Sequence, residues 1–200
     1  MPYIPDIWEV KVIDLFKNIL KSDGIRIVDP AMADNGKLYT GFDTSFVNEM
    51  RNLIGFSDII LPNMTEAGLL TDSEIILENQ TDEYIKDIIY KLKALGAKNI
   101  VLKGVKNIEG KLGIAIYEAD TDSIDIFCTD RIKKDAHGTG DCYAAAFTGC
   151  LMQGKSLGEA VKVAAEFVSE AILKTMDDES HWYGVKFEKA LPVLIRELNK

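Results

Sequence analysis

The chain has 200 residues, of which 47% are hydrophobic and 28% charged, and its formal net charge at pH 7 is −9. This composition is typical of an ordinary soluble globular protein, and the length suits one domain over residues 1–200 with a buried core. No apolar run reaches membrane-spanning length, and an acidic chain is a poor general binder of nucleic acid, so we expect neither partner.

The first half of the chain alternates helices, strands and turns. Apolar residues at helical spacing predict a first helix over residues 6–21, which Ser22-Asp23-Gly24 ends. Residues 31–39 are predicted to form a loop, in which Asn35-Gly36 is a turn signal. The other predicted elements of this half are strands at 25–28 and 58–61 and helices at 44–54, 64–70 and 82–95.

The second half begins with strands and ends with helices. A strand is predicted at 100–102, and an antiparallel pair of strands at 112–117 and 123–127. A glycine-rich turn then opens a helix that ends at about residue 152, and a long helix follows at 157–176. A loop is predicted at 181–184 and a last helix at 187–198, which Pro192 bends. Strands that alternate with helices of ten or more residues indicate βαβ units, so the fold class is α/β with a mostly parallel sheet.

Three cysteines bear on metal binding and on the cellular compartment. Cys128, Cys142 and Cys150 form no C-x-x-C pair, and with the two histidines they make no plausible zinc set. Cys142 and Cys150 lie eight residues apart in a predicted helix, which favours core packing for both. We therefore expect a protein of the reducing cytoplasm.

Polar residues follow three of the predicted strands. Asp29 ends the first, Asn63 follows the second with Glu66 close behind, and Lys103 ends the third. Each has an ordinary explanation as a strand end, a helix cap or a solvated charge. Ligands of open α/β sheets, however, bind beyond the carboxyl ends of the strands, where these side chains would meet. Carboxylate and amide oxygens suit Mg²⁺, and a lysine neutralises phosphate.

The stretch from Asp135 to Ala146 carries the strongest chemical signal. Gly138, Thr139 and Gly140 precede Asp141 and a run of helix-favouring alanines, so free N–H groups should lie at a helix N-terminus, where phosphate binds well. Asp141 there is either a helix cap or a general base for a hydroxyl that attacks a phosphoryl group.

These motifs resemble the ribokinase-like superfamily, whose signature is G-A-G-D or G-T-G-D with the aspartate as catalytic base. Within it the chain is similar to the vitamin B6 kinases, which phosphorylate pyridoxal, pyridoxine and pyridoxamine. The similarity lies in residues 28–39 (Val-Asp-Pro-Ala-Met-Ala-Asp-Asn-Gly-Lys-Leu-Tyr), 62–67 (Pro-Asn-Met-Thr-Glu-Ala), 137–141 (His-Gly-Thr-Gly-Asp) and 182–188 (Trp-Tyr-Gly-Val-Lys-Phe-Glu). It implies a three-layer α/β/α fold, a homodimer, and ATP and Mg²⁺ as nucleotide substrate and cofactor.

The resemblance also assigns roles in phosphoryl transfer. It implies that Asp141 takes the proton from the 5′-hydroxymethyl group of the B6 vitamer, while Gly138, Thr139 and Gly140 hold the γ-phosphoryl group. It further implies that the metal, the phosphates and the substrate are contacted by residues of the first two-thirds of the chain. These are Asp29 and Glu66 for Mg²⁺, Asn63, Glu66 and Lys103 for the nucleotide phosphates, and Asp34 and Tyr39 of the substrate-covering loop.

One departure from the family and two related kinase families leave alternatives open. Members begin with further strands and helices, so we expect roughly two or three βα units, on the order of 80 residues, to be absent here. A truncated nucleotide-binding chain without turnover is therefore one alternative. Hydroxymethylpyrimidine kinases are another, although they usually carry cysteine where this chain has Asp141. Sugar kinases share the G-x-G-D sequence but lack the loop over residues 34–39.

Overall fold

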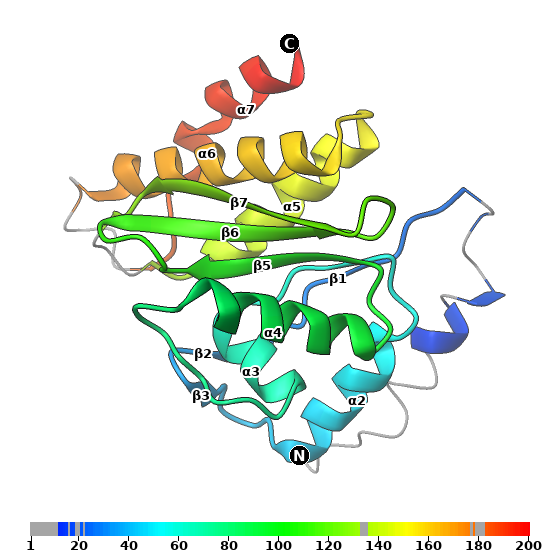
Figure 1. Ribbon diagram of the computed structural model, residues 1–200. Coiled ribbons are helices and arrows are strands. Elements are labelled where there is room, and N and C mark those ends of the chain that lie inside the picture. The colour runs from blue at the N-terminus through cyan, green and yellow to red at the C-terminus, as the bar shows by residue number, and fades with distance from the viewer. Residues whose placement is uncertain are drawn as a thin grey trace. The chain divides into compact units, whose positions relative to one another are not determined.

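The computed structural model describes residues 12–15, 17–18, 21, 23–132, 136–176, 178 and 183–200 (Figure 1). They fall into two compact units, Met1–Ile126 and Phe127–Lys200, which are described separately below. The single domain expected over residues 1–200 stays a prediction. Residues 12–15 and 17–18 are helical, as expected, and the other parts of the helix predicted over 6–21 lie outside the described residues or are not helical.

Among its described residues, unit 1 contains a main sheet, a two-stranded sheet and three helices, besides the helical residues 12–15 and 17–18. Its elements are β1 (Ile27–Val28), β2 (Ala33–Asp34), β3 (Lys37–Leu38), α2 (Thr44–Ile54), β4 (Ile59–Ile60), α3 (Met64–Leu70), α4 (Asp82–Ala94), β5 (Asn99–Val105), β6 (Lys111–Glu118) and the start of β7 (Ser123–Asp130), which continues into unit 2. In the part of the chain that the structure describes, no helix is long and apolar enough to cross a bilayer.

The main sheet has the strand order β1-β4-β5-β6-β7. Its first three strands are parallel, with Ile27 opposite Ile59 and Ile60 opposite Ile100. β6 runs antiparallel to β5, and only residues 119–122 join β6 to β7, which makes that pair antiparallel too. Figure 1 shows α2, α3 and α4 together on one face of this sheet, where the apolar core lies. The mixed α/β class is confirmed.

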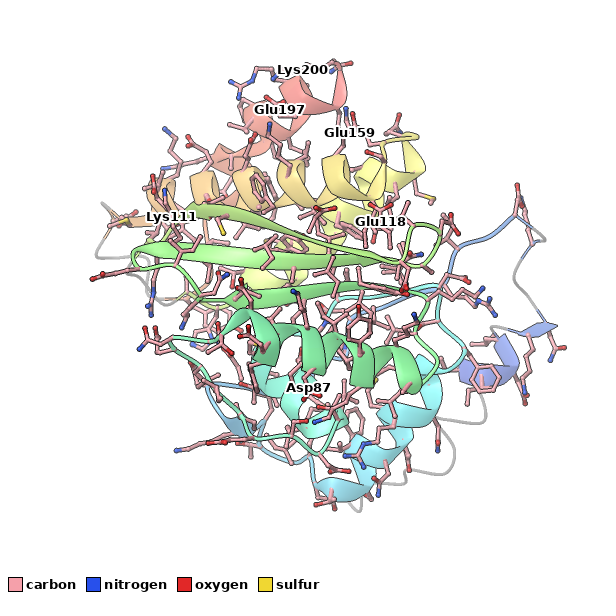
Figure 2. All side chains as sticks on the ribbon, in the orientation of Figure 1. Asp87, Lys111, Glu118, Glu159, Glu197 and Lys200 are labelled. Atoms are coloured by element: carbon pink, nitrogen blue, oxygen red, sulfur yellow. The ribbon has the colours of Figure 1, made fainter. Side chains whose placement is uncertain are left out.

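The helices follow their sequence signals closely, whereas the strands do not. α2 and α3 have the predicted bounds, and α4 ends one residue early, before a C-terminal Gly96 at φ +103°. β1 and β4 are only two residues long, shorter than predicted, while β5 extends on both sides of the predicted strand. The charged side chain of Asp87 on α4 lies on the exposed surface (Figure 2).

Residues 31–39 form a hairpin rather than a loop without strands. β2 pairs with β3, with Ala33 opposite Leu38 and Asp34 opposite Lys37. The turn between them is the predicted Asn-Gly, and both Asn35 (φ 49°) and Gly36 (φ 78°) have positive φ. That combination belongs to the type I′ turn, whose twist suits a two-residue hairpin connection.

Unit 2 holds α5 (Thr139–Met152), α6 (Leu157–Met176), the 3₁₀ turn η1 (Phe187–Lys189) and α7 (Leu191–Leu198). α6 packs against α5, has several buried alanines, and has the predicted bounds. The single bent helix predicted at 187–198 is wrong, because η1 and α7 are separate and Pro192 lies in the first turn of α7, where its missing N–H costs nothing. Core packing is confirmed for Cys150, whereas Cys142 is only partly buried.

Candidate active site

Three of the predicted site residues meet at one edge of the sheet in unit 1. Asp29 follows β1, Asn63 lies just beyond β4, and Lys103 belongs to the last part of β5. The three strands are neighbours, the Lys103 N–H donates to the Pro62 carbonyl (2.8 Å), and Asn63 forms a parallel bridge with Lys103. The carboxyl ends of the strands therefore bring these side chains together as predicted, in the place where open α/β sheets bind ligands.

Lys103 and Asp29 form an ion pair across this edge. The Lys103 ammonium donates to Asp29 Oδ1 at 3.1 Å, and the two side chains are only 16% and 21% exposed. Lys103 is thus not a freely solvated surface charge. A bulge follows it in β5, where Gly104 has φ +82°. A half-buried ammonium of this kind is suited to meet an anionic ligand, since Asp29 already orients it.

Asn63 and Glu66 begin α3 with a capping box. Asn63 Oδ1 accepts from the Glu66 N–H (2.9 Å), and Glu66 Oε2 accepts from the Asn63 N–H (2.8 Å). The other Glu66 oxygen accepts from the Met32 N–H at 3.2 Å, and Glu66 is only 2% exposed. Burial raises the pKa of the Glu66 carboxyl to about 7, although the N–H donors and Lys103 oppose that rise.

The first turn of α3 also holds the hairpin formed by β2 and β3. Asn63 Nδ2 donates to the Ala33 carbonyl at 2.8 Å, and the Gly36 N–H donates to Thr65 Oγ1 at 3.0 Å. Asp34 and Tyr39, the two residues predicted in the substrate loop, are exposed on this hairpin. Thr65 was not singled out from the sequence, because its partner is a backbone N–H 29 positions away and no local pattern marks it.

The predicted magnesium ligands fit the ion unequally. Among the described residues, no three His, Cys, Asp or Glu side chains cluster in a way that could hold a metal. Glu66 engages both oxygens with backbone N–H groups, so it is a poor direct ligand in this arrangement. Asp29 keeps Oδ2 available beside Lys103, and Mg²⁺ in nucleotide sites needs only one or two carboxylates in addition to phosphates and waters. Asp29 therefore fits a nucleotide-bound ion.

In unit 2 the glycine-rich turn opens α5 as predicted. Gly138 is the N-cap residue with φ +78°, it makes no side-chain cap, and Thr139, Gly140 and Asp141 form the first turn. A Cβ added at Gly138 or Gly140 would meet no atom within 4 Å, so the backbone here borders open space. The N–H groups of a fourteen-residue helix are available to an anion at this end, and Asp141 is exposed beside them.

Two further contacts fix the start of α5. Thr139 Oγ1 donates to the Ala136 carbonyl at 3.3 Å, which ties the hydroxyl to the preceding turn. The His137 ring stacks on Tyr183 with centroids 5.3 Å apart. Burial and the neighbouring Asp141 carboxylate raise the pKa of the Cys142 thiol, so Cys142 is an unreactive neighbour of the turn rather than a nucleophile.

A family model described as phosphomethylpyrimidine kinase matches residues 7–185. The chain belongs to this family. Its relatives confirm the resemblance to ribokinase-like kinases and include proteins of the vitamin B6 branch. The structure gives the positions of the candidate site residues. The roles of these residues in catalysis and binding stay predictions.

Curated relatives and solved structures name both expected substrates. A hydroxymethylpyrimidine/phosphomethylpyrimidine kinase of Staphylococcus aureus is 31% identical over 155 residues, which cover 74% of this chain and 53% of the relative. The chain thus spans about half the length of the curated relatives it matches. A putative phosphomethylpyrimidine kinase of Bacteroides thetaiotaomicron, whose second crystal form contains pyridoxal, is 32% identical with a TM-score of 0.89, over 96% of this chain and 66% of that one. Pyridoxal kinase from Lactobacillus plantarum is 29% identical with a TM-score of 0.75, over 86% and 62%.

Proposed function

We propose that this chain serves an ATP- and Mg²⁺-dependent kinase that phosphorylates the 5′-hydroxymethyl group of a B6 vitamer. The observation that carries the proposal is the edge of unit 1, where the Lys103–Asp29 ion pair and the capped turn of α3 follow three adjacent parallel strands. A phosphate-binding edge of this kind, on a chain that also opens a helix with Gly-Thr-Gly-Asp, suits phosphoryl transfer.

Each residue has a defined task in this proposal. Asp141 accepts the proton of the acceptor hydroxyl as that oxygen bonds to the γ-phosphorus and the bond to the ADP oxygen breaks. The N–H groups of Thr139 and Gly140 stabilise the charge on the transferring group. Lys103 contacts the nucleotide phosphates, and Asp29 would hold Mg²⁺, which neutralises phosphate charge when bound.

Asn63 and Glu66 have a supporting task in the same scheme. Their reciprocal hydrogen bonds set the start of α3 beside Lys103, and the buried Glu66 carboxylate holds the Met32 N–H. They therefore contribute to nucleotide binding by fixing the backbone of the edge, and Glu66 reaches a metal only through water. The homodimer and the cytoplasmic location stay predictions.

The identity of the acceptor rests on two observations that point different ways. A 31%-identical structure contains pyridoxal, and the pyridoxal kinase of Lactobacillus plantarum is 29% identical, which supports a B6 vitamer. The curated relatives of similar identity are hydroxymethylpyrimidine/phosphomethylpyrimidine kinases, which supports a pyrimidine alcohol as the second candidate. We favour the B6 vitamer because Asp141 stands in the base position that the B6 kinases use.

An acceptor panel tests the proposal. ADP release is measured with Mg-ATP and, in turn, pyridoxal, pyridoxamine, hydroxymethylpyrimidine, ribose and no acceptor, and we expect pyridoxal or pyridoxamine to give the highest kcat/KM. Asp141→Asn keeps the shape of the side chain and should lower kcat by roughly 10²–10⁴-fold. Glu159→Gln, which alters a first-turn carboxylate of α6, is the matched control. A sugar as the best acceptor, or full turnover by Asp141→Asn, would refute the proposal.

A further inference from the structure

The hairpin formed by β2 and β3 is too small to hold its own shape. Each strand has two residues, and isolated hairpins are at best marginally stable in water. Its base is held by several contacts: Asn63 donates to the Ala33 carbonyl, Glu66 accepts from the Met32 N–H, and the Tyr39 N–H donates to the Met32 carbonyl at 2.9 Å. The position of the base therefore follows the start of α3.

The tip of the hairpin is held differently. Gly36, the second residue of the turn, donates its N–H to Thr65 Oγ1 at 3.0 Å. Thr65 is 1% exposed, and a β-branched side chain in a helix has few rotamers, so this oxygen has a well-defined position. Leu38 of β3 packs against the apolar core and Leu77 lies near Gly36, but such apolar contacts are not directional. The buried hydroxyl thus supplies the directional contact that orients the tip as the hairpin leaves the edge of the sheet.

We propose that Thr65 is a positioning residue for the acceptor, which acts by holding the hairpin tip so that Asp34 and Tyr39 meet the substrate in one orientation. This inference rests on the proposed function. The hairpin presents a carboxylate and an exposed aromatic ring next to the edge that carries Lys103 and Asp29. Such a pair suits a small aromatic alcohol with polar substituents, whereas the proposed function assigns the phosphates to Lys103 and to the N–H groups of α5.

The alternative is that Thr65 only satisfies a polar backbone group in the fold. Both roles predict some loss of stability in a variant, so stability does not separate them. They differ in kinetics: a positioning role affects the acceptor and not ATP, because the capping box of Asn63 and Glu66 does not use the Thr65 hydroxyl, and Lys103 and the N–H groups of α5, which the proposed function places on the phosphates, lie on other elements. A lost hydrogen bond between neutral groups changes an equilibrium by about 2- to 10-fold, which sets the scale of the expected effect.

The experiment compares Thr65→Val, Thr65→Ser and Thr71→Val with the unmodified chain. Valine keeps the shape of threonine and removes the acceptor oxygen, whereas serine keeps the oxygen. Thr71 bonds the Ala67 carbonyl at the other end of α3 (2.7 Å), so Thr71→Val is a matched control on the same helix. Hydrogen exchange of residues 33–38 reports the hairpin without any need for turnover, and steady-state kinetics report KM for acceptor and for ATP.

We expect Thr65→Val alone to speed amide exchange at 33–38 and to raise the acceptor KM by about 2- to 10-fold, with the KM for ATP and kcat little changed. Thr65→Ser should restore both. Unchanged exchange in Thr65→Val would refute the role of the hydroxyl at the tip, and faster exchange with an unchanged acceptor KM would refute positioning. If the unmodified chain phosphorylates no acceptor, the proposed function and with it the positioning role fail, while the exchange rates still decide whether Thr65 holds the hairpin.

Discussion

Asp58 joins three strands at the end of the sheet opposite to the candidate site. Its Oδ2 accepts from the Arg26 N–H (3.0 Å) and from Arg26 Nε (2.9 Å), while Oδ1 accepts from Arg26 Nη2 (3.0 Å) and Lys98 Nζ (2.7 Å). The Asp58 carbonyl also accepts from the Asn99 N–H at 3.0 Å. Because Arg26 precedes β1 and Asn99 opens β5, Asp58→Asn perturbs the alignment of all the strands that carry Asp29, Asn63 and Lys103.

The size of the effect follows from these contacts. Asparagine keeps one acceptor oxygen but loses the charge and the two-point pairing with the guanidinium. Hydrogen bonds to charged groups contribute about 1.5–3 kcal/mol, and the 25% and 20% exposure of the two side chains brings solvent screening. We therefore expect Asp58→Asn to lower the free energy of unfolding by about 2 kcal/mol at pH 7.

The effect should depend on pH with a defined sign. Hydrogen bonds from Arg26 hold the pKa of the Asp58 carboxyl well below its ordinary value of 3.8, against the effect of burial. A lowered pKa in the folded chain stabilises that chain above the unfolded-state pKa, and this contribution is lost as the pH falls toward the folded-state pKa. The difference in unfolding free energy between the unmodified chain and Asp58→Asn should thus shrink below about pH 4.

Urea unfolding of both proteins at pH 7, 4 and 2.5, followed by circular dichroism, measures this difference. Asp87→Asn is the control, because the exposed Asp87–Lys91 pair on α4 should contribute well below 1 kcal/mol. Equal midpoints for Asp58→Asn and the unmodified chain at pH 7 would refute the argument. So would a difference that stays the same size in acid, since it would show that the lost contacts do not depend on the charge of Asp58.

Substitutions at three further positions test the groups assigned to phosphate. Lys103→Met removes the partner of Asp29 and should weaken Mg-ATP binding by roughly 10- to 100-fold in titration calorimetry, whereas unchanged binding would place the phosphates elsewhere. Gly140→Trp should also weaken Mg-ATP binding with little change in stability, because no atom lies within 4 Å of its Cβ position. Gly138 has φ +78°, so Gly138→Val should lower the thermal midpoint and the free energy of unfolding, the latter by about 1–2 kcal/mol. Gly138→Asn should lower both by less, because asparagine tolerates positive φ. A Gly138→Val variant with the midpoint of the unmodified chain would contradict the proposed backbone strain.

The parts of the fold that were predicted from sequence are those with strong local signals. α2, α3 and α6 were placed with their exact bounds because caps, turns and helical spacing mark both ends. The hairpin strands were missed because two residues cannot show alternation, although Asn35-Gly36 marked their turn. The prediction of one bent helix at the C-terminal end is wrong because a proline fits the first turn of a new helix as well as a bend within one, and Pro192 lies in the first turn of α7.

The sequence also predicts only part of the candidate site. That Asp29, Asn63 and Lys103 share one edge follows from parallel topology, which the alternation of strands and helices already indicates, and it is confirmed. The ion pair between Lys103 and Asp29 joins positions 74 residues apart, so its distance and burial depend on packing that no local pattern contains. Thr65 was overlooked for the same reason, since its partner lies on another element.

The positions of the candidate site residues explain why the acceptor molecule is harder to assign than the type of reaction. In the proposed function, Lys103, the turn at Gly138 and Asp141 meet groups that every substrate of such a kinase has in common: phosphate oxygens and one hydroxyl. Apart from the choice of aspartate at position 141, these groups carry information about phosphoryl transfer and little about the ring that bears the hydroxyl. Residues 33–39 are different, because they stand beside the edge on a hairpin that α3 holds in place. Discrimination between a pyridine and a pyrimidine alcohol therefore has to come from groups such as this hairpin, and substitutions there should change the choice of acceptor more than the use of ATP.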